Sequence, residues 1–436
     1  MRRRHVFGAA AGVAAAATLL GGVLAGRSAE SVPAVQPQAT ADRLLDGFAA
    51  GDTAARIAAL EQRVEATPED PQALTLLGLA YQQRVRETGD ASLYPRSEDA
   101  LRRALALDSG NALAATGRAA LAAARHDFRE ARRLAERALE LDPYSAPALG
   151  ILGDAAVETG RYEAAFAAFD RMAALKPSVA SYSRIAYARE LLGMTAAAVQ
   201  AMKLAVSAGA GLPEPQAWAL VELGNLYYNS GRLRPAERAY REALARFPGY
   251  HRADAGLARA AAARGRIDEA VVLYRRALDA VPLPEYAARL AETLAAAGRE
   301  AGAAEAYELV DVIQRLFEAN GARTELETAL VDLDRNVRLE DALSRARGAY
   351  AERRSIEAED VLGWALARNG RCEEALVHAR RALRLGTRDA LKLFHLGMIE
   401  RCLGRPAAAR GAFRRALAVN PYFSPRWAPV AREAIR

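Results

Sequence analysis

The amino-acid sequence predicts an all-α protein whose helices stack into a solenoid, and three observations predict it. Hydrophobic residues make up 52% of the 436 residues, but alanine supplies much of this share and aromatic residues only 6%. Alanine and leucine interspersed with arginine and glutamate favour helices that pack closely on one another. No segment has the alternating β-branched pattern of a strand. Turn residues also recur at a fixed period: Pro143 and Pro177 are 34 residues apart, and so are Gly231 and Gly265.

One repeat shows the pattern in full between residues 220 and 248. A first helix ends in Tyr-Tyr-Asn-Ser-Gly, and a second helix ends before Phe247-Pro248. This segment resembles the tetratricopeptide repeat. The residues that match the repeat pattern are Leu223, Gly224, Tyr227, Gly231, Ala236, Tyr240, Ala243 and Pro248. Leu220 stands where that family has an aromatic residue.

Other units repeat this pattern less fully, and together they extend over about residues 42–421. The resemblance implies a right-handed superhelical solenoid of about ten helix pairs. We expect repeats over residues 42–320, a break near Asn320-Gly321, and further repeats with a capping helix over residues 321–436. Tyr422, Phe423 and Trp427 are expected to cover the last open face.

Simple packing physics explains the recurring spacing. A small residue lets one helix cross closely over its partner, and an aromatic side chain fills the space beside it. A glycine ends the first helix in a left-handed turn, and a proline ends the second. One helix pair cannot bury its apolar face alone, so the pairs stack into a one-dimensional array.

The N-terminus has the pattern of an export signal. Three arginines at positions 2–4 precede an uncharged, alanine-rich stretch over residues 6–26. A basic start followed by an apolar segment is typical of a signal peptide or membrane anchor. We expect residues 1–26 to be this segment and residues 27–41, with two prolines, to be a linker. Arg3-Arg4 and the residues after them also resemble a twin-arginine signal. An ordinary export signal or an uncleaved membrane tether are the alternatives.

The sequence carries no pattern of an active site. It has no nucleotide-binding loop, no zinc-protease motif and no nucleophile elbow, and its histidines show no pair at ligand spacing. We therefore expect neither catalysis nor a cofactor. The formal charge of +7 includes the N-terminal arginines, and the remaining charges of both signs are interspersed. This distribution does not indicate nucleic-acid binding.

Cys372 and Cys402 are the only cysteines and lie 30 residues apart in adjacent units. Both fall at the same edge of the predicted stack, so a disulfide is conceivable in an oxidising compartment. We expect unpaired thiols that pack between helices.

A binding surface is expected on the concave face, which first helices line in the tetratricopeptide family. Side chains three and four residues apart share one face of a helix, and in the middle units this stripe carries aromatic, amide and arginine side chains suited to an anchoring groove. The stripe consists of Tyr187, Glu190, Trp218, Asn225, Tyr228, Asn229, Arg252 and Arg259. Glu292 and Trp364 continue it. An alternative is that Trp218 and Tyr228 only cover neighbouring repeats. The family's carboxylate clamp is not reproduced here.

The sequence thus predicts a scaffold outside the cytoplasm that binds a protein or peptide along the concave face of its solenoid. Self-association of the solenoid without a peptide ligand is the alternative.

Overall fold

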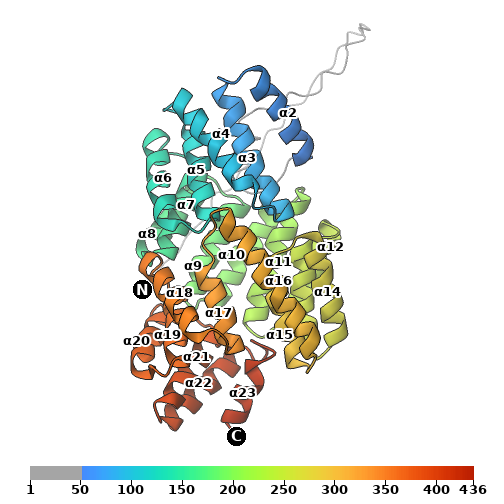
Figure 1. Ribbon diagram of the computed structural model, residues 1–436, viewed down its shortest axis with the longest axis vertical. Coiled ribbons are helices and arrows are strands. Elements are labelled where there is room, and N and C mark those ends of the chain that lie inside the picture. The colour runs from blue at the N-terminus through green and yellow to red at the C-terminus, as the bar shows by residue number, and fades with distance from the viewer. Residues whose placement is uncertain (1–51) are drawn as a thin grey trace, which may run out of the picture. The chain divides into compact units, whose positions relative to one another are not determined.

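The computed structural model describes residues 52–436, which fall within one compact unit made of helices and short turns (Figure 1). The expectations for the signal segment and the linker concern residues 1–41, which lie outside the described residues. Among the helices that are described, none combines the length and the apolar character needed to cross a bilayer.

Within residues 52–436, ten helix pairs follow one another, as the repeat pattern predicts. The first helices are α3 (Pro71–Thr88), α5 (Ala112–Ala124), α7 (Ala146–Glu158), α9 (Val179–Leu191), α11 (Pro213–Asn229), α13 (His251–Ala263), α15 (Pro284–Ala296), α17 (Glu325–Arg335), α19 (Ile356–Arg368) and α21 (Ala390–Cys402). The second helices are α4 (Leu93–Leu107), α6 (Phe128–Leu141), α8 (Tyr162–Leu175), α10 (Thr195–Ala208), α12 (Leu233–Arg246), α14 (Ile267–Ala280), α16 (Glu300–Ala319), α18 (Leu339–Glu352), α20 (Cys372–Ala382) and α22 (Pro406–Val419). Helix α2 (Thr53–Ala66) precedes the pairs, and α23 (Trp427–Ala434) follows them.

Local sequence sets the helix boundaries. The side chains of Asn111 and Asp127 accept hydrogen bonds from backbone N–H groups in the first turns of α5 and α6, where the helix itself offers no acceptor. The turn between α7 and α8 passes through Gly160, whose φ is 76°. Only glycine adopts this left-handed conformation without steric cost. His126 adopts a φ of 60° at the equivalent place one repeat earlier.

The predicted glycine–aromatic crossings are present in the core. In the best-matching repeat, a Cβ added to Gly224 would lie 2.7 Å from Cδ1 of Tyr240. Gly397 and Phe413 repeat this relation in the last pair, with 2.5 Å between the added Cβ and Cε1 of the ring. The Tyr240 and Phe413 side chains are fully buried. Each glycine therefore makes room for a ring that fills the space between the two helices.

The terminal aromatic residues cover the end of the last pairs, as expected. The Trp427 ring stacks on Phe394 with 5.4 Å between the ring centroids, and it meets Trp364 edge to face at 6.1 Å. Phe423 also contacts Phe394, at 5.6 Å. These rings close the core cluster that α17–α22 share.

Residues about 195 positions apart in the sequence lie in contact, because the later repeats return to the earlier ones. The Arg323 backbone N–H donates to the Arg125 carbonyl at 2.9 Å. The Ile356 N–H donates to the Tyr162 hydroxyl at 2.7 Å, and the Tyr228 hydroxyl donates to the Tyr422 carbonyl at 2.8 Å. The sequence separations in these two side-chain bonds are both 194. Residues 323–422, which we call the second turn of the solenoid, thus pack on residues 125–228, the first turn.

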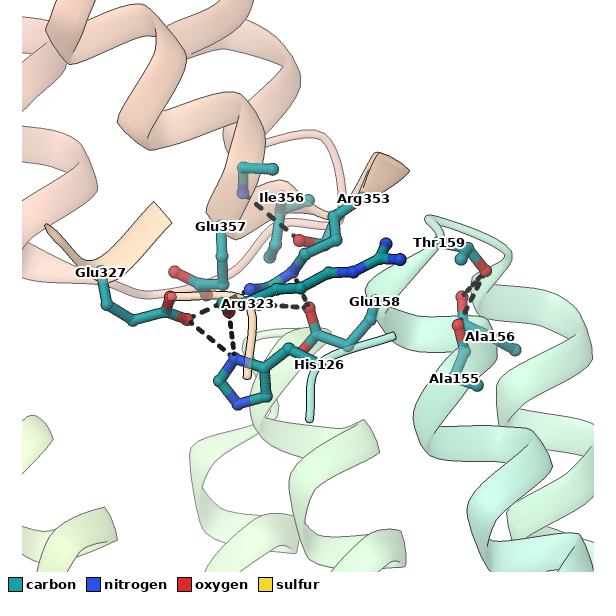
Figure 2. A network of polar contacts seen from close by, with 12 residues as sticks. His126, Ala155, Ala156, Glu158, Thr159, Arg323, Glu327, Arg353, Ile356 and Glu357 are labelled. Atoms are coloured by element: carbon teal, nitrogen blue, oxygen red, sulfur yellow. Dashed lines mark hydrogen bonds and ion pairs between the residues drawn. The ribbon is translucent and has the colours of Figure 1, made fainter. Parts of the chain in front are cut away.

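Arg353 provides an ion pair between the two turns (Figure 2). This arginine comes from the end of α18 and is buried. It bonds Glu158 of α7 at 2.9 Å and Glu327 of α17 at 3.1 Å. Its guanidinium carbon also lies 4.9 Å from the ring centroid of Phe128. Truncating an arginine that is paired in this way would leave two carboxylates without their partner.

The long helix α16 explains how the chain returns to its earlier repeats. It has 20 residues, whereas α14 and α18 each have 14. Phe317 in its last turn packs against the cluster that contains Val85, Tyr94 and Leu121. The extra length of α16, which ends just before Asn320, therefore carries the chain across to α3–α5.

The structure corrects the expectation for the cysteines. Cys372 and Cys402 form a disulfide, with 6.2 Å between their Cα atoms, and no free cysteine remains among residues 52–436. The bond joins the start of α20 to the end of α21. Equivalent edges of successive repeats meet closely in the stack, which brings the two side chains within bonding reach.

Candidate functional site

The inner face of the middle repeats forms a groove, which we define by the pocket residues on α9, α11 and α13. Its volume is about 1280 Å³, which exceeds the roughly 300–1,000 Å³ typical of small-molecule clefts. Seven of the eight residues expected at the concave face line it: Tyr187, Glu190, Trp218, Asn225, Asn229, Arg252 and Arg259. Residues from α2 and α3 line its other side, including Thr53 and Glu87.

Tyr228 differs from the expectation, because its side chain does not line the groove. It is 3% exposed, and its hydroxyl reaches the Tyr422 carbonyl on the other turn of the solenoid. The Asn420 side-chain amide donates to the Tyr228 carbonyl at 3.0 Å. The tyrosine therefore covers a neighbouring part of the solenoid, which was the alternative interpretation of this residue. Trp364 is likewise buried, and its indole N–H donates to Asp334 at 3.2 Å.

Asn225 organises the polar side chains between α11 and α13. Its amide oxygen accepts hydrogen bonds from the Tyr240 hydroxyl at 2.9 Å and from Arg259 at 2.8 Å. Its amide nitrogen donates to Glu222 at 3.2 Å. Arg259 also lies over the Tyr228 ring, 4.0 Å from its centroid. This network fixes Arg259 in place before any partner arrives.

Two carboxylates in the groove have raised pKa values because they are surrounded by protein. Burial raises the pKa of Glu190 to about 7, although the Asn229 amide, which donates to it at 3.2 Å, lowers this pKa. Acidic neighbours raise it further, and they are Glu222, Asp389 and Glu357. Burial also raises the pKa of Glu222. Both carboxylates would be easier to ionise if a cation approached them.

Glu222 was not among the residues expected at the groove, although a signal for it is present. It follows Trp218 by four residues and precedes Asn225 by three, so it shares their face of α11. The lining residues of α2 and α3 could not be found in this way. They reach the groove only because the first repeats lie opposite the middle ones.

The histidines of α13, α20 and α21 make contacts within the protein core or between helices. His251 is buried at the groove edge and hydrogen-bonds the Tyr286 hydroxyl at 2.8 Å, and burial lowers its pKa to about 4. His395 pairs with Asp360 at 3.0 Å, and His378 with Glu359 at 2.6 Å. Among the described residues, no group of three or more histidine, cysteine, aspartate or glutamate side chains could hold a metal ion.

Comparison with known proteins agrees with this architecture. The tetratricopeptide repeat model matches residues 116–180, 221–283 and 361–424. The fold is an all-α repeat solenoid, and these three segments of it match the tetratricopeptide repeat. None of the curated proteins compared with the chain matches it.

Several solved structures resemble the chain. One is a chain in the crystal structure of the APC/C hetero-tetramer Cut9-Hcn1. It has 14% identity and a TM-score of 0.39, and the match covers 87% of this chain and 92% of that chain. PilW, described as a widely conserved type IV pilus biogenesis factor, has 19% identity and a TM-score of 0.38, covering 45% of this chain and 90% of its own. MamA has 25% identity and a TM-score of 0.29, covering 37% and 92%. We base no argument about function on likenesses of this size.

Proposed function

We propose that the protein is a non-catalytic scaffold that binds a polypeptide segment in the groove between α9, α11 and α13. The observation that carries this proposal is the placement of two aromatic and two amide side chains around one cavity, where stacking alone requires only small or charged residues. They are Tyr187, Trp218, Asn225 and Asn229. The groove is large enough for a peptide and is built on rigid helices. Repeat solenoids commonly use such concave surfaces for binding.

We further propose that the protein acts outside the cytoplasm. The basic and apolar pattern of residues 1–26 supports export. The disulfide between Cys372 and Cys402 adds support, since structural disulfides persist mainly in oxidising compartments. A reporter that is active only after export, fused behind residues 1–26, tests this directly. A reporter that stays inactive with that fusion would refute the assignment.

A displayed peptide library tests the binding proposal without knowledge of the natural partner. The purified protein should enrich specific peptides, and the Tyr187→Ala, Trp218→Ala double variant should bind them at least about tenfold more weakly. Tyr144→Ala is a suitable control, because Tyr144 is an exposed aromatic residue that does not line this pocket. Circular dichroism verifies that each variant keeps its helical content.

The proposal fails if the parent protein enriches no peptide, or if the double variant binds the enriched peptides unchanged. If the parent enriches none and instead forms concentration-dependent oligomers, the self-association hypothesis replaces it. Sedimentation of the same preparation measures this.

A further inference from the structure

The charges that line the groove are not all balanced within the protein. Glu190 and Glu222 each accept a hydrogen bond from an asparagine amide, but within residues 52–436 neither has an arginine, lysine or histidine within ion-pair distance. Two other acidic side chains that line the groove are neutralised. Asp154 pairs with Arg184 at 2.6 Å, and Glu87 with Arg84 at 3.3 Å.

Buried carboxylates elsewhere in the chain show how this protein ordinarily treats such groups. Asp254 and Asp332 are almost fully buried, and each bonds an arginine: Arg276 pairs with Asp254, and Arg338 pairs with Asp332 at 2.6 Å. Removing a carboxylate from water is costly unless an opposite charge compensates it. Arg252 and Arg259 lie near Glu222 and lower its pKa, although neither forms an ion pair with it, whereas the charged neighbours that act on Glu190 are all acidic. An added cation would therefore be stabilised most beside Glu190.

An aromatic ring stands beside each of these two carboxylates. Tyr187 precedes Glu190 by three residues on α9, and Trp218 precedes Glu222 by four on α11, so each ring shares a helix face with its carboxylate. All four side chains line the same pocket. Tyr187 is 37% exposed, which leaves its ring open to the groove. Aromatic faces next to carboxylates are the usual surroundings of a bound ammonium or guanidinium group.

The next helix presents the opposite charge. Arg252 on α13 lines the groove, and within the described residues no hydrogen bond or ion pair involves its guanidinium. The nearest acidic influences on it come from Glu222 and Glu285. The carboxylates of α9 and α11 in the lining are Glu190, Glu214 and Glu222, and Arg184 of α9 pairs with Asp154. Arg252 on α13 adds a cation that forms no ion pair within the described residues.

From this arrangement we infer that the groove recognises a polypeptide segment by an arginine or lysine side chain, which enters between Tyr187, Glu190, Trp218 and Glu222. An acidic group of the same segment contacts Arg252. The inference rests on the proposed peptide-binding function and specifies the chemistry of its ligand. Charge complementarity is its basis: a neutral apolar segment would leave both carboxylates buried without a counter-ion, and an acidic one would be repelled by them.

The experiment uses synthetic peptides taken from the library selection, each made in two forms. In the second form citrulline or glutamine replaces the basic residue, which removes the charge and keeps the length. Affinities are measured by calorimetry for the parent protein and for the Glu190→Gln, Glu222→Gln double variant. The control variant is Glu242→Gln, because Glu242 is exposed on the outer helix α12, at 3.4 Å from Arg246.

We expect selected peptides to be enriched in arginine or lysine. The double variant should bind the charged form at least about tenfold more weakly, a difference of about 1.4 kcal/mol. It should bind the uncharged form within about twofold of the parent, and Glu242→Gln should change neither affinity. Selected peptides that are neutral or acidic, or an unchanged affinity of the double variant for the charged form, would overturn the inference and leave the peptide-binding function standing. The absence of any selected peptide would overturn both.

Discussion

The contact between the two turns of the solenoid can be tested by adding a single methyl group at Gly160. This glycine lies in the turn between α7 and α8 and has a φ of 76°. A Cβ added there would collide with the carbonyl oxygen of Arg354 and would lie 3.0 Å from the carbonyl carbon. Gly265 has nearly the same φ of 75°, but an added Cβ would meet nothing within 4 Å. Gly265→Ala is therefore a matched control.

Both substitutions should cost about 1–2 kcal/mol for placing alanine in the left-handed conformation. Gly160→Ala should cost about 1–3 kcal/mol more, as for other overpacked sites. The obstacle is backbone, which cannot rotate away as a side chain can. The ion pairs of Arg353 and the hydrogen bond from Ile356 to Tyr162 hold that backbone in place on either side of Arg354.

Native-state hydrogen exchange provides the assay, because a repeat array opens locally rather than all at once. The extra cost in Gly160→Ala corresponds to roughly 5- to 150-fold faster exchange over residues 349–360. Gly265→Ala should leave exchange in that segment unchanged. Equal stability losses in the two variants, with residues 349–360 exchanging as in the parent, would show that the turns do not touch there.

Three further predictions concern packing, redox state and pH. Gly224→Ala should lower the free energy of unfolding by about 1–2 kcal/mol, because its Cβ would collide with a buried ring. Gly348 lies at an exposed helical site where an added Cβ would meet nothing within 4 Å. Gly348→Ala should therefore raise the free energy of unfolding by about 0.5–1 kcal/mol. Urea unfolding measures both, and equal effects would contradict the proposed crossing. Replacing both Cys372 and Cys402 by serine should cost about 3–4 kcal/mol, given the length of the closed loop. An unchanged melting temperature, with or without reductant, would argue against the bond. Because burial raises the pKa of Glu190 to about 7, this side chain is mostly protonated at pH 6 and mostly ionised at pH 8, so affinity for a basic peptide should rise severalfold over that range. Glu190→Gln should remove the rise, and a pH profile that the substitution leaves intact would assign it to another group.

The fold could be predicted from the sequence because its rules are local. Glycine–aromatic pairs such as Gly224 and Tyr240 lie 16 residues apart, so a single repeat reveals the crossing and the other repeats confirm its register. The groove residues on α9, α11 and α13 could be placed for the same reason, since helical spacing alone puts Trp218 and Asn225 on one face.

Contacts between the two turns could not be predicted in this way. They join residues nearly 200 positions apart and use arginines and backbone carbonyls that no motif distinguishes from ordinary surface. Tyr228 shows the consequence, because its place on the stripe indicated the groove, while the returning chain at Tyr422 covers it. Whether Cys372 bonds Cys402 depends on the distance between the edges of adjacent repeats. The 30 residues between the two cysteines do not determine that distance.

The central claim is that a polypeptide binds along α9, α11 and α13 inside the solenoid. Hydrogen exchange with and without a saturating selected peptide tests it most directly, because exchange reports each helix separately. We predict slower exchange in these three first helices, with the outer helices α10, α12 and α14 unchanged. Protection confined to those outer helices or to the α23 cap, with none in α9, α11 and α13, would contradict the claim.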